Sequence, residues 1–259
     1  MPTFDYPRSV FQSLALCMAV LATGCSRSPV APPAPCGNVA YQVSDPAERV
    51  NRQVFAFNRT LDDYVLAPLA RGYRALPATV QKGTHNFVAN FGEPKVFIND
   101  LLQGNGERSV ATLARFLINT TVGVVGLVDV SGTMGIARHR ADFGQTFGVW
   151  RLADGPVVEL PLLGTYNLRD ATGRMLSVLV DPLGSHSDTV DTLGSVAAAG
   201  GVVDGRARAL PLTERLRTQP DYYQALRDDT AQRRANFVAS GRAGALGERA
   251  ARCLPGASA

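Results

Sequence analysis

Apolar residues recur at helical spacing, every three or four positions, through most of the chain. The clearest pattern begins at Asp45-Pro46-Ala47-Glu48, where an aspartate N-cap and an early proline favour a helix start. It continues from Val50 to Leu69, and Pro68 is expected to bend or end that helix. Similar patterns predict helices over 78–91, 95–103, 107–122, 173–180, 188–199 and 220–239, the last closed by Gly241. Glycine- and proline-rich turns punctuate 123–170 without a run of alternating strands, so the predicted fold class is mainly α.

The N-terminus carries a different hydrophobic pattern. An apolar run from Leu14 to Leu21 is too short to remain as a membrane-spanning helix, so we expect a cleaved signal peptide. The following Ala22-Thr23-Gly24-Cys25 resembles a lipobox, which predicts acylation of the Cys25 thiol by chains such as palmitate. Ser26 is compatible with sorting to the outer membrane. The alternative is an ordinary secretory signal with an incidental cysteine.

These patterns divide the chain into four predicted parts. They are a lipoprotein signal peptide over 1–24, a lipidated cysteine and proline-rich tether over 25–43, a helical domain over 44–241 and a C-terminal tail over 242–259. Cys36 and Cys253 remain after the signal and the lipidated cysteine are set aside. In an oxidising periplasm these two cysteines are candidates for a disulfide.

Composition narrows the range of partners. The net charge of +4 is too mild to argue for nucleic acid, yet it suits an anionic membrane surface. Residues 109–130 carry only two charges, Arg115 and Asp129, and two glycines interrupt their apolar run. A single-pass span is therefore not expected there; the segment suits burial in protein or a dip into one leaflet beside a polar cavity.

Two of the predicted helices carry a polar seam. The shared spacing of four, three and four residues puts each set on one helix face: Arg108, Thr112, Arg115 and Asn119 in one helix, and Asn51, Phe55, Asn58 and Asp62 in the other. One interpretation is a pair of ordinary solvent-facing stripes. The other is that the seams line a conduit with polar and apolar walls.

No motif indicates catalysis. The chain has no Gly-x-Ser-x-Gly elbow or phosphate loop, and its three histidines lack metal-ligand spacing. His139 stands between two arginines, which favours a solvated loop. The block Asp142-Phe143-Gly144-Gln145-Thr146 is interpreted as a structural turn. We predict no catalytic residues, no metal site and no cofactor beyond covalent lipid at Cys25, and therefore not an enzyme.

Ordered motifs over about residues 44–241 resemble the MlaA (VacJ) family of outer-membrane phospholipid-handling lipoproteins. The matching residues are Asp45-Pro46, Glu48, Asn51-Arg52, Phe55, Phe57, Asn58, Asn90, Glu93-Pro94, Asn99, Leu102-Gln103-Gly104, Arg115-Phe116, Asn119, Gly123, Gly126, Asp129, Asp142 to Thr146, Gly148, Leu160-Pro161, Gly164, Arg169-Asp170, Asp221-Tyr222 and Asn236-Phe237. Val157 and the pair Trp150-Arg151 depart from the family pattern.

The resemblance implies a single ring-like helical domain embedded in one membrane leaflet and held by an N-terminal lipid anchor. It implies a passive path from the outer leaflet of the outer membrane, by which mislocalised phospholipid reaches a soluble periplasmic carrier and lipid asymmetry is maintained. A porin trimer is the other implied partner, on the periplasmic face. We place Asn51, Phe55, Asn58, Arg115 and Asn119 near that path. A structural porin-associated lipoprotein and a membrane-anchored lipid hydrolase are the alternatives.

Overall fold

The computed structural model describes residues 43–180 and 188–244. The predictions for the signal peptide, Cys25, the tether, Cys36 and Cys253 lie outside these residues. The helical elements are α2 (Glu48–Leu61), the π-helix η1 (Asp62–Leu66), α3 (Ala67–Arg74), α4 (Ala78–Leu102), α5 (Gly106–Thr121), α6 (Val130–Thr133), α7 (Phe143–Val149), α8 (Leu168–Leu179), α9 (Asp188–Leu216) and α10 (Tyr222–Ala243). The strands are β1 (Val157–Leu160) and β2 (Gly164–Asn167). The mainly α prediction is confirmed.

The first predicted helix is interrupted just before Pro68. The π-helical turn η1 separates α2 from α3 while the backbone stays helical. In it the Ala67 amide donates to the Asp62 carbonyl, five residues earlier, and Pro68, which lacks an N–H, follows directly. The predicted N-cap was wrong. Ala47 takes the cap position, while the Asp45 carboxylate accepts hydrogen bonds from the side chains of Asn51 and Tyr223.

A single helix, α4, replaces the two helices predicted over 78–91 and 95–103. It runs through Pro94, although proline removes one backbone donor inside a helix. Helix α4 packs against both α5 and α9, and this tertiary packing outweighs the local penalty. The C-terminal helix also differs, because Gly244 rather than Gly241 closes α10 in the left-handed conformation.

A short β-hairpin lies in the region predicted to hold only turns. Strand β1 pairs antiparallel with β2, with Val157 opposite Asn167 and Leu160 opposite Gly164. Each strand has four residues, so the alternation is too short to stand out in the sequence. Helix α7 (Phe143–Val149) was also missed, because its glycines are typical of a turn.

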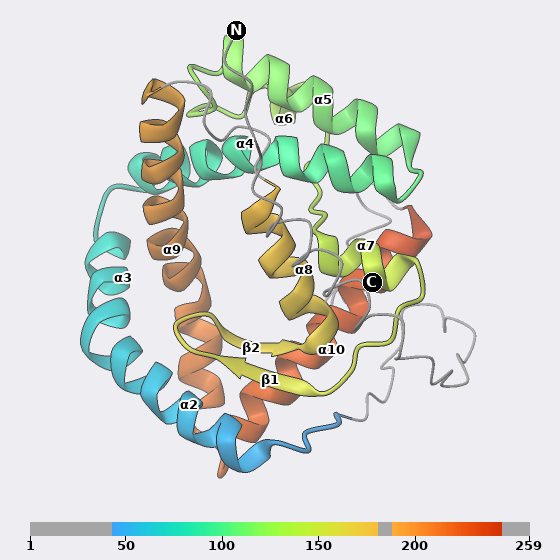
Figure 1. Cartoon of the computed structure of the whole chain (residues 1–259). Coiled ribbons are helices and arrows are strands. Elements are labelled where there is room, and N and C mark those ends of the chain that lie inside the picture. The colour runs from blue at the N-terminus through green and yellow to red at the C-terminus, as the bar shows by residue number, and fades with distance from the viewer. Residues whose placement is uncertain (1–42, 181–187, 245–259) are drawn as a thin grey trace, which may run out of the picture. The chain divides into compact units, whose positions relative to one another are not determined.

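Contacts between the elements form a closed circuit (Figure 1). Helix α2 leads through η1 to α3, which packs on α9, and α9 packs on α4. Helix α4 contacts α7, which packs on α8, and α8 returns to α2 through the hairpin. Helix α5 lies on α4, and α10 contacts α7 and β2. This order of contacts agrees with the ring-like domain that the resemblance implied.

The buried apolar core is small. It is centred on Ala67 and Ala70 of α3 and on Ala207 and Leu210 of α9, with Tyr73 packed beside them. Elsewhere the buried side chains are mostly polar or charged, while many large apolar side chains are exposed. This distribution is the reverse of the usual one for a water-soluble domain.

Candidate functional site

Helix α5 has its polar side inside and its apolar side outside. Arg108, Thr112, Arg115 and Asn119 do share one face, as predicted, and each is at most 1% exposed. On the opposite side Val110 is 69% exposed, and Leu113 and Leu117 are 42% and 53% exposed. The solvent-facing interpretation of this seam was therefore wrong, because α4 and the segments after α5 cover it.

Arg115 is the centre of a buried ionic network. Its Nε lies 3.2 Å from Glu93 on α4, and its Nη2 lies 2.8 Å from Asp129 at the start of α6. Nη1 donates to the carbonyl of Ile136. Burial raises the pKa of Glu93 even though Arg115 and Arg138 favour its charged form. One arginine thus joins α4, α6 and the chain after α6.

Asp129 collects donors from several directions. Its Oδ1 accepts from Asn119 at 3.1 Å, from the Ser131 hydroxyl at 3.0 Å and from the Gly132 amide at 3.0 Å. Burial opposes ionisation, but these hydrogen bonds and the Arg115 charge lower the pKa of Asp129 to about 2. Asn119 also accepts from the Ser131 amide at 2.9 Å, so this pair fixes the start of α6 against α5.

A second buried cluster lies nearby on the same seam. The Thr112 hydroxyl donates to Asp100 at 2.7 Å, and His139 Nε2 lies 2.8 Å from the same carboxylate. The solvated position predicted for His139 was wrong, since its side chain is 5% exposed and Asp100 is fully buried. Threonine, aspartate and histidine meet here, but a substrate cannot reach groups so deeply buried. The cluster is structural: its hydrogen bonds hold α4, α5 and the loop after α6 together.

The loop between α5 and α6 exposes apolar side chains on its outer side and packs closely against α4 on its inner side. Val122, Val124 and Val125 are 67%, 61% and 43% exposed. Val124 and Val125 adopt φ values of 53° and 55°, which are strained for β-branched residues. At Gly126, with φ of 89°, an added Cβ would lie 2.4 Å from Asn90. At Gly123 an added Cβ would lie 2.3 Å from the Val128 carbonyl oxygen, so both glycines are required by close approach of neighbouring groups.

On α2, the two seam asparagines fasten the hairpin. Asn51 donates to the Val157 carbonyl and accepts from the Glu159 amide at 3.0 Å. Asn58 donates to the Glu159 carboxylate at 2.8 Å and to the Leu160 carbonyl at 2.9 Å. Both side chains therefore replace the hydrogen bonds that an edge strand would make with a neighbouring strand.

Phe55 lies between α2 and α10. Its ring meets those of Tyr222 and Tyr223 edge-on, at 5.3 Å in each case. With Arg52 and Arg59 these rings line a cleft of about 340 Å³. Arg52 is engaged by Asp221 at 2.6 Å across this cleft. Phe55, one of the predicted path residues, therefore lies at this cleft.

The five predicted path residues fall into two groups. Asn51, Phe55 and Asn58 contact the hairpin and α10, whereas Arg115 and Asn119 contact α4, α6 and the following chain. Their placement near a lipid path stays a prediction. The structure assigns each of them a partner within the fold.

The structural interpretation of the block at 142–146 agrees with the observed contacts. The Asp142 carboxylate caps α7 by accepting from the Gln145 amide at 2.7 Å. Arg234 of α10 bonds to Asp142 at 2.8 Å and to Asp170 of α8 at 2.7 Å. Burial opposes the charge of Asp142, yet Arg234 holds its pKa below the usual range. The block joins three helices.

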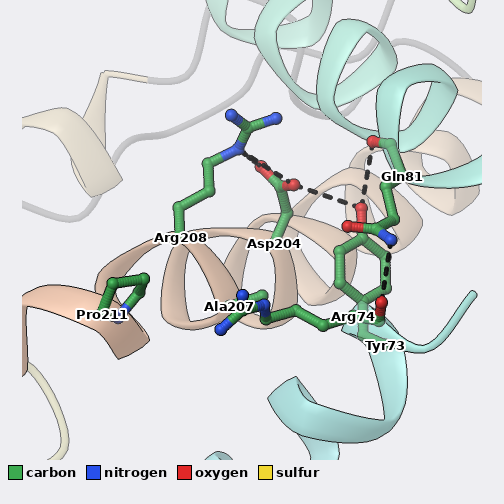
Figure 2. A pocket seen from close by; sticks show the side chains of 7 residues that line it. All are labelled: Tyr73, Arg74, Gln81, Asp204, Ala207, Arg208 and Pro211. Atoms are coloured by element: carbon green, nitrogen blue, oxygen red, sulfur yellow. Dashed lines mark hydrogen bonds and ion pairs between the residues drawn. The ribbon is translucent and has the colours of Figure 1, made fainter. Parts of the chain in front are cut away.

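Sequence reasoning missed a cluster around Asp204 of α9. Its carboxylate accepts from Tyr73 of α3 at 3.1 Å and lies 3.0 Å from Arg208 Nε (Figure 2). It also lies 2.8 Å from His85 Nδ1 of α4. Burial opposes ionisation of Asp204, but His85 and Arg208 hold its pKa below the usual range. A cavity of about 220 Å³ adjoins the cluster. No short motif could reveal it, because Asp204 lies 131 residues after Tyr73 and 119 residues after His85.

Residues 43–180 and 188–244 contain neither a candidate membrane-spanning helix nor a candidate metal site. No helix in these ranges is both long enough and apolar enough to cross a bilayer. No three histidine, cysteine, aspartate or glutamate side chains there are grouped to hold a metal ion.

Comparison with known proteins decides the family. The family profile of the MlaA lipoprotein matches residues 43–237. The chain belongs to the MlaA lipoprotein family. The intermembrane phospholipid transport system lipoprotein MlaA of Escherichia coli (strain K12) is 34% identical over 203 residues, covering 76% of this chain and 79% of that protein. An uncharacterised protein of Rickettsia felis is 36% identical over 193 residues, covering 73% of this chain and 76% of that protein.

One solved structure is also similar to this chain in fold and sequence. It was described under "Structural basis for maintenance of bacterial outer membrane lipid asymmetry" and aligns with a TM-score of 0.66 at 32% identity. The alignment covers 75% of this chain and 99% of the other. The family resemblance drawn from the ordered motifs is thus confirmed.

Proposed function

We propose that this protein is an outer-membrane lipoprotein that gives mislocalised outer-leaflet phospholipid a passive path to a soluble periplasmic carrier. In this way it maintains outer-membrane lipid asymmetry. The proposal is supported by family membership and by the names of the similar proteins, which describe intermembrane phospholipid transport. The single structural observation that carries it is the reversed polarity of α5.

A helix with charges inside and valine and leucine outside suits a hydrocarbon environment. Large contiguous apolar patches on a protein mark contact with a partner or a membrane. Exposed apolar side chains continue from α5 to other elements, including Phe57, Val65, Leu69, Val122, Val124, Leu162, Met175, Val178 and Leu179. We therefore place the helical domain in one leaflet of the outer membrane, where these side chains meet acyl chains.

Such a path answers a large energetic barrier. For a phospholipid with about 30 chain CH₂ groups, at ~0.8 kcal/mol each, exposing the acyl chains to water would cost on the order of 25 kcal/mol of free energy. A direct transfer from leaflet to carrier avoids this cost, and it requires no cofactor or catalytic group. We assign Asn51, Asn58, Arg115 and Asn119 to the framework that holds the path's surrounding elements in place, because each bonds within the fold.

The lipid anchor at Cys25 is part of the proposal. Mass spectrometry of the purified mature protein should find acyl chains on Cys25 as the first residue. The variant Cys25→Ser should lose those chains and its outer-membrane fractionation. An unacylated wild-type N-terminus would contradict the anchor.

The transport proposal is tested by measuring outer-leaflet phospholipid in cells with and without the gene. Deletion should raise surface phospholipid, and the wild-type gene should restore it. A double variant, Val110→Asp with Leu117→Asp, puts charges on the exposed face of α5 and should restore it poorly. Gln53→Asp is the matched control, because Gln53 is an exposed polar residue on α2.

Two outcomes would favour the alternatives. Co-purification with porin trimers without any change in surface phospholipid on deletion would indicate a porin-associated structural lipoprotein. Release of free fatty acid from labelled phospholipid by the purified protein would indicate a hydrolase. Crosslinking to both a porin trimer and a soluble lipid carrier is the result that the transport proposal expects.

A further inference from the structure

An exposed tryptophan and an exposed arginine follow one another at the end of α7. Trp150 is 49% exposed and is the only tryptophan in the chain. Arg151 comes directly after it and is also exposed. Both residues depart from the family pattern, and neither belongs to the networks described above.

The backbone at Arg151 adopts a conformation that favours glycine. The Arg151 amide donates to the Gly148 carbonyl at 3.0 Å. The next amide, that of Leu152, donates to the Phe147 carbonyl at 2.9 Å. These two bonds form a Schellman motif, in which the residue just after the helix is left-handed and is usually glycine. Arg151 holds that position with φ of 68°. A strained residue with an exposed side chain points to a use for that side chain outside the fold.

The end of α7 is positively charged. The Arg151 guanidinium forms no ion pair or hydrogen bond with any residue that the structure describes. Arg242 of α10 adds a second cation, since its Nη2 donates to the Gly148 carbonyl at 2.7 Å. Burial, together with the charges of Arg151 and Arg169, lowers the pKa of Arg242. The acid that opposes this shift, Asp154, is already paired with Arg169.

The polar group of the Trp150 indole is bonded within the fold. Its Nε1 donates to the Leu102 carbonyl, at the end of α4, over 3.0 Å. The exposed part of the ring therefore needs no hydrogen-bond partner. Leu102 itself is 42% exposed, and Leu152, two residues after the tryptophan, is 40% exposed. An apolar ring beside an arginine is typical of surfaces at the membrane–water interface.

We propose that Trp150 and Arg151 anchor the domain at the headgroup level of the leaflet that holds it. The indole lies at the edge of the hydrocarbon, and the Arg151 guanidinium pairs with the phosphate of an anionic phospholipid. The long arginine side chain can extend from the hydrocarbon edge to the phosphates. The inference rests on the leaflet placement in the proposed function and adds the depth at which the end of α7 lies.

The native tryptophan supplies the first test, because the emission comes from one indole. Full-length protein is reconstituted in vesicles of phosphatidylethanolamine and phosphatidylglycerol. Part of the lipid carries bromines, either near the headgroup end of the acyl chains or near their methyl end. The shallow bromines should quench Trp150 emission about two-fold more than the deep ones.

Two controls move the tryptophan in a Trp150→Phe background. Leu113→Trp lies on the apolar outer face of α5 and should be quenched by lipid bromines. Arg233→Trp lies on α10, which exposes none of the large apolar side chains, and should be quenched weakly.

The arginine is tested by the lipid preference around the same indole. The shallow bromines are carried by phosphatidylglycerol or by phosphatidylcholine at equal mole fraction. The wild type should favour the anionic lipid by up to about 5-fold. Arg151→Lys should keep most of this preference, whereas Arg151→Gly should lose it. Because glycine relieves the left-handed strain, the thermal stability of Arg151→Gly in detergent should not fall. A purely structural role for Arg151 would not affect the lipid preference.

Several outcomes overturn the inference. If Leu113→Trp is quenched but Trp150 is not, the anchor is excluded and the leaflet placement stands. If neither is quenched, the leaflet placement of the proposed function fails as well. Stronger quenching of Trp150 by the deep bromines would place the ring inside the hydrocarbon. Quenching that disappears when a porin trimer is added would assign this surface to a protein partner. An unchanged lipid preference in Arg151→Gly would remove the arginine from the anchor.

Discussion

The contact of α3 with α9 and the contact of α4 with α5 solve the same packing problem with opposite chemistry. Between α3 and α9 the buried side chains are Ala67, Ala70, Ala207 and Leu210, an ordinary small apolar core. Between α4 and α5 they include Glu93, Asp100, Arg108 and Arg115, which are at most 2% exposed. On the outside the two regions are alike, with leucine and valine exposed on both.

The difference shows that two regions with similar exposed side chains can have buried side chains of opposite polarity. A common apolar exterior indicates a common apolar environment around both regions. The interiors then follow different rules, because burial of apolar groups gives little advantage when the outside is apolar as well. Buried ion pairs and hydrogen bonds supply specific, directional contacts instead. Four predictions test this comparison, in order of expected effect.

The largest effect is expected in the charged interior. Arg115→Leu would leave Glu93 and Asp129 with only the longer ion pairs to Arg138, at 3.8 and 3.7 Å, and should lower the free energy of unfolding by about 3–5 kcal/mol. Urea denaturation in non-ionic detergent measures this loss. Arg115→Lys keeps the charge and should lose less. A stable Arg115→Leu protein that unfolds like the wild type would remove the network from the account of this region.

A smaller loss is expected in the apolar interior. Leu210 is 1% exposed, so Leu210→Ala creates a cavity and should cost about 2–4 kcal/mol. Leu113→Ala is the matched change on the outer face of α5, where the side chain is 42% exposed. In detergent it should cost under about 1 kcal/mol. Equal losses for the two variants would mean that Leu113 is covered by protein.

The charged interior should also respond to acid. The pKa of Asp129 falls from 3.8 to about 2 in the folded protein, so its charge stabilises the fold above the ordinary value. That contribution, about 2 kcal/mol, is lost as the pH falls from about 5 towards 2. Asp129→Asn should show a correspondingly flatter loss of stability over this range. The same acid sensitivity in both proteins would place the titrating group elsewhere.

The smallest effect is expected in the strained loop after α5. Val124 has φ of 53°, a conformation that costs a residue with a side chain about 1–2 kcal/mol and that glycine adopts freely. After glycine's own entropy cost of about 0.5–1 kcal/mol, Val124→Gly should raise stability by about 0.5 kcal/mol. Val122 has φ of −81° and is exposed to a similar degree, so Val122→Gly should instead lower stability. A loss in both would mean that the strain at Val124 is compensated by its contacts.

Local sequence patterns predicted which residues form a helix and share a face. They did not predict which other elements cover that face. The spacing of Arg108, Thr112, Arg115 and Asn119 correctly put them on one face, because helical geometry depends only on the chain itself. Which side of α5 faces inward depends on the partners that cover it. Those partners, Glu93 and Asp129, come from other elements. The prediction that His139 is solvated was wrong for the same reason, since its buried partner Asp100 lies 39 residues away.

By itself the sequence determined the mainly α class, most of the helices and, through its ordered motifs, the family. Those features depend on local periodicity and on fixed residue spacing. Only the tertiary structure decided that α4 continues through Pro94, that the asparagines of α2 hold a hairpin, and that Asp204 joins three helices. Each of these depends on groups that are distant in the chain, and the free energy of such contacts has no signature in any one segment.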